Sequence, residues 1–335
     1  MNKAYIVVVL VLLFLLFVHQ ESLWPPVDFP PLTEYIQVHQ REATRFLRGD
    51  PRARMVFYVC DGQTASGGLG DRLRMITTAL TAAILTDRGF GIRHTVPVAL
   101  EDYMAPAFLD WAAPGFVLSS NQDAEQFVGL DNCGPFMDRL GELGSRNVLV
   151  FRGNCGGIGT LLQTHEDRHS LGKLNERGLL LQMLLRLLFR PSDRVASRMG
   201  SGRGVGLHVR TGGDGLWSDP QRLRPESIPL FADAALALNG SSYYIASDSQ
   251  RAIAQLQVTL TPSRSSDLEI AHLERSSGDH LRTFVDWWVL AGMDALVISR
   301  SGFGEMASAY SCSPAMKVYD NGSIIAMPRG ECVPL

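Results

Sequence analysis

The sequence has few lysines, no zinc-ligand spacing among its cysteines and no excess of charge. Lysine supplies only three of the 31 basic residues, and the net charge of the 335-residue chain is −3. A general nucleic-acid binder carries a basic excess, so that class is excluded. Charged residues make up 19% of the chain and apolar residues 46%, which excludes a disordered solvating chain and leaves enough material for about two domains.

Only one long hydrophobic run is present, from Ala4 to Val18, directly after Lys3. Fifteen helical residues span roughly 22 Å, less than the ~30 Å of a bilayer core, so a cleaved signal peptide and a short signal anchor both fit. No small-x-small cleavage site follows, and Trp24 could lie at the membrane interface. We therefore favour a type II anchor over residues 4–20 with a cytoplasmic tip at 1–3. Either alternative places the rest of the chain in the secretory lumen or outside the cell.

Two further features agree with a lumenal location, namely Golgi or ER. Asn239 and Asn321 each begin an Asn-Gly-Ser glycosylation sequon. Five cysteines follow the apolar run, which predicts one or two disulfides and one remaining thiol in an oxidising compartment. Cys312–Cys332 is the preferred pair because it would close a short C-terminal loop, although the sequence alone does not fix the connectivity.

The segment from His165 to His169 matches the zinc-protease pattern H-E-x-x-H. Its two inner residues, Asp167 and Arg168, are both charged, and its flanks are polar, whereas a packed active-site helix needs apolar or small residues there. We interpret it as a surface loop and predict no metal site.

Strand and helix patterns alternate along the chain, which predicts an α/β fold with two lobes. Residues 21–50 are predicted to be a stem. A strand at 55–60, a glycine loop, a helix at 71–88 and a strand at 90–94 begin an N-terminal lobe over 51–195. A second series, beginning with a strand at 205–209, forms a C-terminal lobe over 196–335.

Three loops follow predicted strands at places where α/β proteins bind ligands. The first, Gly67–Arg74 (GGLGDRLR), precedes a helix, so its free amides and the helix dipole favour an anion. The second, 206–214 (GLHVRTGGD), places His208 and Arg210 on one face of a strand. The third, 298–304 (ISRSGFG), offers the Ser301 hydroxyl and free amides to a phosphate.

Taken together and in this order, these segments resemble the GT-B fucosyltransferases. That group includes the plant xyloglucan, bacterial nodulation-type, α-1,6 and protein O-fucosyltransferases. The resemblance also covers AILTDR (83–88), LLFRPSDRV (187–195), YYIASDS (243–249) and DALVISRSGFGEMA (294–307). Two positions depart from the family pattern: Asp214 lies four residues after Arg210 rather than three, and Glu305 stands where relatives often have an aromatic residue or arginine.

The resemblance implies two Rossmann-like lobes that face a cleft, and an enzyme that moves L-fucose from GDP-β-L-fucose to a glycan or protein hydroxyl with inversion. No Asp-x-Asp metal motif occurs. By analogy, Arg210 would therefore be the fixed cation on the departing diphosphate, with no metal or other cofactor. The implied GDP-sugar site comprises Gly68, Gly70, Arg72, His208, Arg210, Asp248, Ser301, Gly302 and Phe303.

The proton acceptor stays open: Asp71 and Asp214 are the candidates, and no base is needed if breaking of the bond to the diphosphate leads the reaction. The alternatives to a fucosyltransferase are a GT-B transferase that uses another nucleotide sugar and an inactive lectin-like protein on the same scaffold.

Overall fold

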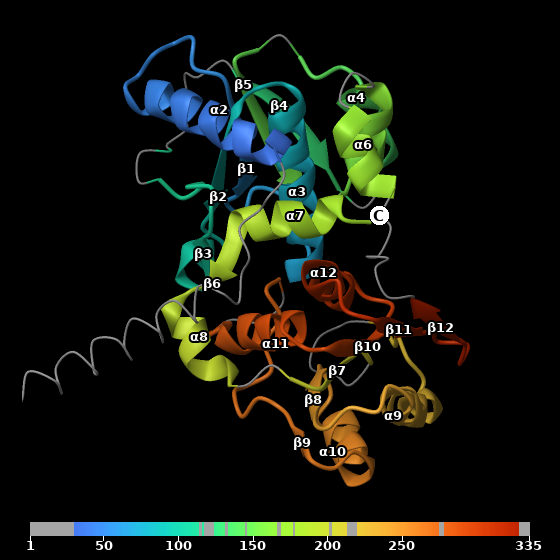
Figure 1. Cartoon of the computed structure of the whole chain (residues 1–335). Helices are drawn as coiled ribbons and strands as arrows, with labels where there is room; N and C mark the ends of the chain where they lie inside the picture. The colour runs from blue at the N-terminus through green and yellow to red at the C-terminus, as the bar shows by residue number, and fades with distance from the viewer. Residues whose placement is uncertain are drawn as a thin grey trace, which may run out of the picture.

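Two α/β lobes lie one above the other along the long axis of the molecule (Figure 1). The computed structural model describes residues 30–113, 116, 124–130, 133–144, 146–165, 169–176, 178–200, 203–212, 220–274 and 278–327. The predicted cytoplasmic tip and anchor (1–20) lie outside these residues. Within the described ranges, no helix combines the length and apolar character needed to cross a membrane.

A parallel four-stranded sheet forms the centre of the N-terminal lobe, in the order β2-β1-β5-β4. All six residues of β1 (Met55–Cys60) are buried, as expected for a strand that is covered on both faces. The predicted strands at 55–60 and 90–94 are confirmed as β1 and β2 (Gly89–His94). The remaining strands of this sheet are β4 (Ala124–Gly129) and β5 (Val148–Gly153).

The helix that follows the glycine loop, α3 (Leu69–Leu85), crosses this sheet and also reaches the other lobe, where it contacts α12. It begins two residues before the predicted start. The rest of the lobe comprises η1 (Leu100–Asp102), β3 (Met104–Pro106), α4 (Gly134–Leu140), α5 (Ile158–Thr164), α6 (His169–Glu176), α7 (Leu180–Leu188) and β6 (Phe189–Pro191).

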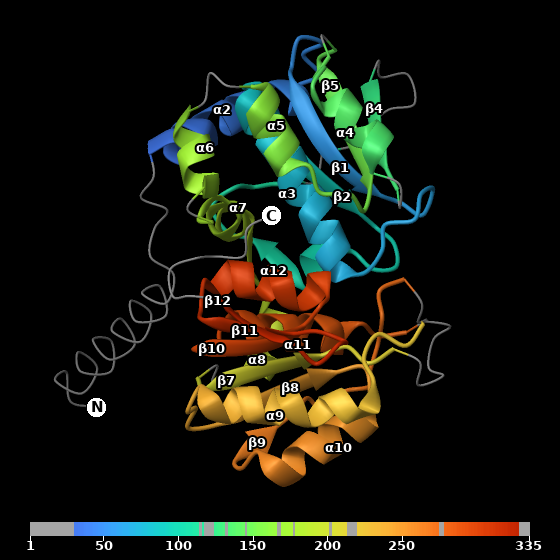
Figure 2. The same cartoon turned by 90° about the vertical axis from the view of Figure 1, so that its right-hand side faces the viewer.

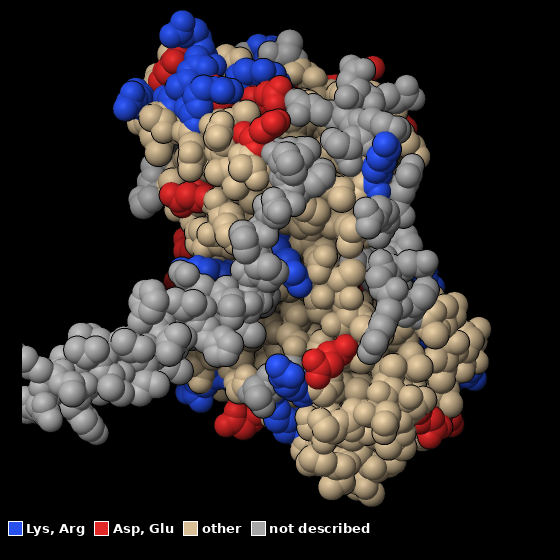
Figure 3. Space-filling model, in the orientation of Figure 1, with Lys and Arg blue, Asp and Glu red and all other residues tan. Residues whose placement is uncertain are grey.

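The predicted stem is, from Pro30 onward, part of the N-terminal lobe. Helix α2 (Pro30–Leu47) packs beside β2, with Leu32 and Tyr35 buried. His39 of this helix accepts a hydrogen bond from the backbone N–H of Phe90 at 3.1 Å. The amphipathic face is thus covered by the sheet edge rather than by solvent, which the sequence pattern alone could not decide. Basic side chains gather on the outer surface over α2 (Figure 3). The side chain of Arg41, a residue of this helix, is 58% exposed.

The C-terminal lobe contains a six-stranded sheet in the order β12-β11-β10-β7-β8-β9, parallel except for β12. Helices α9 and α10 cover its outer face, whereas α11 and α12 lie between the sheet and the N-terminal lobe (Figure 2). The elements are α8 (Asp193–Met199), β7 (Val205–Val209), η3 (Pro225–Ser227), α9 (Ile228–Ala237), β8 (Tyr243–Ser247), α10 (Gln250–Thr259), β9 (Ser263–Arg264), α11 (Leu281–Ala291), β10 (Ala295–Ser299), α12 (Gly302–Ser311), β11 (Ala315–Val318) and β12 (Ile324–Met327).

One hydrophobic core runs through both lobes. It joins residues of α3 and α7 to residues of α11 and α12, including Leu73, Leu184, Trp288 and Tyr310. Because burial of apolar surface is the main stabilising term, this shared core fixes how the lobes face each other. A second core, around Leu207 and Phe231, lies beneath the outer helices of the C-terminal lobe.

The structure contains a disulfide that the sequence did not single out, Cys133–Cys155, with a Cα–Cα distance of 5.7 Å. Cys312 is disulfide-bonded as well, and its predicted partner Cys332 lies outside the described residues. Among the described cysteines, Cys60 is a buried free thiol. Both sequon asparagines, Asn239 and Asn321, are exposed.

The H-E-x-x-H segment does not form one helix, since His165 lies just after the end of α5 and His169 begins α6. Among the described residues, no group of three or more histidine, cysteine, aspartate or glutamate side chains could hold a metal ion.

Candidate functional site

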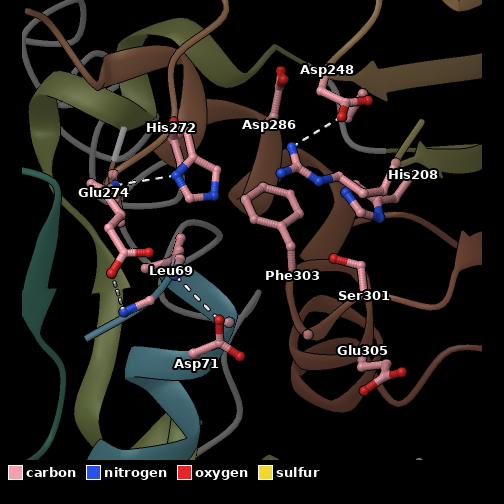
Figure 4. Close-up of a pocket in the computed structure, with 18 of the residues that line it drawn as sticks. Leu69, Asp71, His208, Asp248, His272, Glu274, Asp286, Ser301, Phe303 and Glu305 are labelled. Atoms are coloured by element: carbon pink, nitrogen blue, oxygen red, sulfur yellow. Dashed lines mark hydrogen bonds and ion pairs between the residues drawn. The ribbon is translucent and has the colours of Figure 1, made fainter. Parts of the chain in front are cut away.

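A cavity of about 680 Å³ lies between the lobes, at the carboxyl ends of β7, β8 and β10. The N-terminal lobe contributes the loop and first turn of α3, and the C-terminal lobe contributes the start of α12 and the loop before α11. Parallel α/β sheets bind ligands at this edge because the strand ends and helix N-termini leave backbone groups free. The structure therefore brings most of the predicted site residues into one cavity (Figure 4).

Arg210 faces this cavity and is anchored by Asp248. The Nη1 of Arg210 lies 3.0 Å from Oδ2 of Asp248, and the arginine side chain is 16% exposed. Asp248 also accepts hydrogen bonds from the backbone N–H and hydroxyl of Thr211 and from the N–H of Gly212. Four donors of the protein itself occupy this carboxylate. These bonds hold Asp248 and Arg210 in place at the GDP-sugar site that the family resemblance implies.

His208 lies beneath the cavity as a neutral ring. It stacks against Phe303, with 5.0 Å between ring centroids, and its Nδ1 lies 3.4 Å from the Ser299 hydroxyl. Burial lowers the pKa of His208 to about 4, so the ring carries no charge at neutral pH. An uncharged ring can hydrogen-bond a nucleoside without adding to the charge that Arg210 supplies.

The first turn of α12 forms one wall of the cavity through Ser301, Gly302 and Phe303. At this point the glycine loop of the other lobe approaches closely. A Cβ atom on Gly70 would lie 2.2 Å from the carbonyl carbon of Gly302, so the two backbones touch. Gly70 thus lets the lobes meet at the start of α12, and Gly68, two residues earlier, lines the cavity.

Arg72, predicted to contact the donor, points away from the cavity into the N-terminal lobe. Its guanidinium donates to the carbonyls of Gly67 (2.9 Å) and Val96 (2.7 Å), and its Nη1 lies 2.7 Å from Nε2 of His94. The residue is 4% exposed. The structure therefore does not bring Arg72 to the cavity wall, because the helix turn that carries it faces the core.

Arg74 lies two residues further along α3 and, unlike Arg72, does line the cavity. It forms an ion pair across the lobes with Glu305, which also pairs with Lys317 at 2.6 Å. A second Nη atom lies 3.6 Å from Oδ1 of Asp71. The departure from the family pattern at Glu305 is thus coupled to Arg74 on the opposite lobe.

The structure adds two cavity residues that the sequence reasoning missed, Arg282 and Asp286. They are one turn apart on α11, with Arg282 Nε 3.3 Å from Asp286 Oδ2, and Tyr244 donates its hydroxyl to the same carboxylate. The Nη2 of Arg282 is buried without a hydrogen-bond partner. Burial raises the pKa of Asp286. The sequence signal that could have identified them is a pair of charged residues, Arg282 and Asp286, in a largely apolar helix.

A second pair that the sequence did not indicate is His272 and Glu274, from the loop before α11. Both line the cavity on the side of Asp71 (Figure 4). The backbone N–H of Glu274 donates to Nδ1 of His272 at 3.2 Å. Asp214, the other predicted proton acceptor, lies outside the described residues.

Comparison with known proteins gives matches in structure and none in sequence. The sequence matches no protein-family model, and no curated protein matches it. Arabidopsis thaliana FUT1, in a mutant form with GDP, superposes with a TM-score of 0.64 at 15% identity, covering 88% of this chain and 79% of that one.

NodZ fucosyltransferase from Bradyrhizobium gives 0.50 at 14% identity, with 82% and 99% covered. NodZ α-1,6-fucosyltransferase co-crystallised with GDP gives 0.50 at 12% identity, with 82% and 98% covered. The chain therefore has the two-lobed α/β fold of fucosyltransferases of known structure.

Proposed function

We propose that this protein is a glycosyltransferase of the inverting type, which transfers L-fucose from GDP-β-L-fucose to a hydroxyl of a glycan or glycoprotein and forms an α-linkage. The observation that carries the proposal is the Arg210 guanidinium, held by Asp248 in the cavity between the lobes. The shared fold supports it, since solved relatives of that fold were crystallised with GDP.

The chemistry requires a positive charge where the diphosphate leaves. As the bond between the anomeric carbon and the phosphate oxygen breaks, negative charge grows on GDP. Arg210 would stabilise that charge, and because Asp248 already fixes its side chain, little reorganisation is needed in the transition state. Ser301 and the first amides of α12 would bind the same diphosphate. In this mechanism no step is assigned to a metal.

The pair on α11 supports guanine as the base of the donor. A carboxylate can accept the two N–H donors on the guanine edge, and the Nη2 of Arg282 can donate to the guanine carbonyl. Asp286 and Arg282 present this acceptor–donor pattern at the cavity wall. Uracil has a carbonyl oxygen on each side of its single N–H. These oxygens would be repelled by the Asp286 carboxylate.

We also propose a lumenal catalytic domain on a single-pass type II anchor in the Golgi or ER membrane. The apolar run at 4–18, the Cys133–Cys155 disulfide and the exposed sequons support this location. Release of the protein from membranes by detergent, and a shift in gel mobility after glycosidase treatment, would test it.

The purified lumenal fragment tests the proposed activity directly. We expect it to release GDP from GDP-fucose at an equal rate with and without EDTA, and to act much more slowly on GDP-mannose and UDP-glucose. Arg210→Ala should fold normally and lose about 100- to 1,000-fold in rate. A preference for another donor would favour the other-donor alternative. Binding of GDP without turnover would favour the lectin-like one.

A further inference from the structure

Two carboxylates from opposite lobes are held by consecutive amides of the glycine loop. The backbone N–H of Gly67 donates to Oε1 of Glu274 at 3.3 Å, and that of Gly68 donates to Oδ2 of Asp71 at 3.2 Å. Asp71 belongs to α3, whereas Glu274 belongs to the loop before α11. This arrangement exists only where the lobes meet, and Figure 4 shows it on the side of Phe303 opposite His208 and Asp248.

The surroundings of Asp71 increase its ability to hold a proton. Desolvation in the cavity raises the pKa of Asp71, and Glu274 raises it further, while Arg74, Arg72 and the Gly68 amide act in the opposite direction. Arg74 also forms an ion pair with Glu305, so its positive charge stabilises two carboxylates rather than Asp71 alone. The ring of His272 lies beside the same loop, with Nε2 3.4 Å from the position of a Cβ on Gly68. The Asp71 side chain is nevertheless 41% exposed, so a ligand in the cavity can reach it.

Asp71 also lies close to the predicted site of the reacting sugar. Its Oδ1 is 3.4 Å from the position of a Cβ on Gly302, at the start of the helix that would bind the diphosphate. One oxygen, Oδ2, accepts from the Gly68 amide, as in an ordinary helix cap, and the other, Oδ1, lies 3.6 Å from Nη1 of Arg74, which also lines the cavity. A cap alone would not need a second carboxylate from the other lobe.

We propose that Asp71 accepts the proton of the acceptor hydroxyl, and that Glu274 is a positioning residue that holds the glycine loop and Asp71 in place from the opposite lobe. This inference rests on the proposed fucosyl transfer. The hydroxyl oxygen forms a bond to the anomeric carbon, the bond from that carbon to the phosphate oxygen breaks with its electron pair remaining on GDP, and the hydroxyl proton moves to Oδ1 of Asp71. Nothing is oxidised or reduced.

Hydrolysis of GDP-fucose, in which water replaces the acceptor, tests the proposal through its pH profile. The wild type should lose activity toward acid as Asp71 becomes protonated. Glu274→Gln keeps an oxygen for the Gly67 amide but removes the charge that raises the pKa of Asp71, so the acid midpoint should move to lower pH. Glu274→Ala also removes the hydrogen bond and should have a lower plateau rate than Glu274→Gln.

Asp71→Asn should lower the rate about 100-fold or more, and the remaining rate should no longer decrease toward acid pH. Glu269→Gln is the matched control, because Glu269 lies in the same loop, is exposed and does not line the cavity. An acid limb that stays in place in Glu274→Gln would overturn the proposal. The proposal would also be overturned if the loss of activity toward acid persisted in Asp71→Asn but disappeared in Asp214→Asn.

A titration of the Asp71 carboxyl by carbon NMR separates this inference from the proposed function. The midpoint of the Asp71 titration should be lower in Glu274→Gln than in the wild type, whether or not GDP-fucose is consumed. A fall in the midpoint without turnover would support the positioning role and count against fucosyl transfer. Turnover with an unchanged midpoint would leave fucosyl transfer standing and overturn the inference.

Discussion

The backbones of Gly70 and Gly302 touch across the two lobes. A Cβ on Gly70 would lie 2.2 Å from the carbonyl carbon of Gly302 and 2.5 Å from the backbone nitrogen of Phe303. Neither atom can move aside as a flexible side chain would. The glycine loop of one lobe is thereby placed against the predicted diphosphate-binding turn of the other.

Gly70→Ala should therefore separate the lobes locally. We expect a loss of about 1–3 kcal/mol in the free energy of unfolding and a decrease of at least about tenfold in GDP affinity, measured by urea denaturation and calorimetry. Gly159→Ala is the control, since a Cβ there meets no atom within 4 Å. Unchanged GDP affinity in Gly70→Ala would contradict the assigned contact.

Arg72→Met should affect stability rather than ligand binding. The substitution removes the donor that satisfies the carbonyls of Gly67 and Val96, and each buried acceptor left unpaired costs about 1–3 kcal/mol. The urea midpoint should fall, while the folded fraction binds GDP as the wild type does. Arg251→Met, at an exposed position of α10, should change neither quantity. A selective loss of GDP affinity would restore the donor-binding role predicted from sequence.

Asp286→Asn should weaken recognition of the nucleotide base. Replacing one carboxylate oxygen with an amide that donates places a donor against the N–H groups of guanine, at a cost of about 1–3 kcal/mol in GDP binding. Inorganic pyrophosphate, which has no base, should bind as before. Asp233→Asn on the outer helix α9 is the matched control. Equal losses for GDP and pyrophosphate would show that the variant disturbs the cavity as a whole.

Stability should decrease in mild acid because three buried histidines are neutral in the folded protein. Burial lowers the pKa of His39, His94 and His208 to about 4 each, against an ordinary value of 6.5. The unfolded chain binds these protons first, so the stability contributed by the neutral rings is present above about pH 6.5 and is lost as the pH falls toward 4. Urea midpoints at pH 7 and pH 5 measure this. Identical midpoints would show that the rings are hydrated in the folded state.

Much of the fold could be predicted from local pattern. Continuous apolar runs bounded by glycine or polar residues predicted β1 and β7, and the strand–loop–helix order predicted two α/β lobes with their ligand-binding loops at one edge. Helix α2 was the main difference. Its amphipathic pattern was visible, but a periodic apolar face does not say whether a sheet edge will cover it.

What the sequence determined was three of the loops that form the cavity, those after β1, β7 and β10, because strand and helix periodicity is encoded within each short segment. What only the tertiary structure decided was the direction of individual side chains and the partners they meet across the lobes. Arg72 and Arg74 lie two residues apart on α3, so they point to nearly opposite sides of the helix. The packing of α3 between its own sheet and α12 turned Arg72 inward and Arg74 toward Glu305.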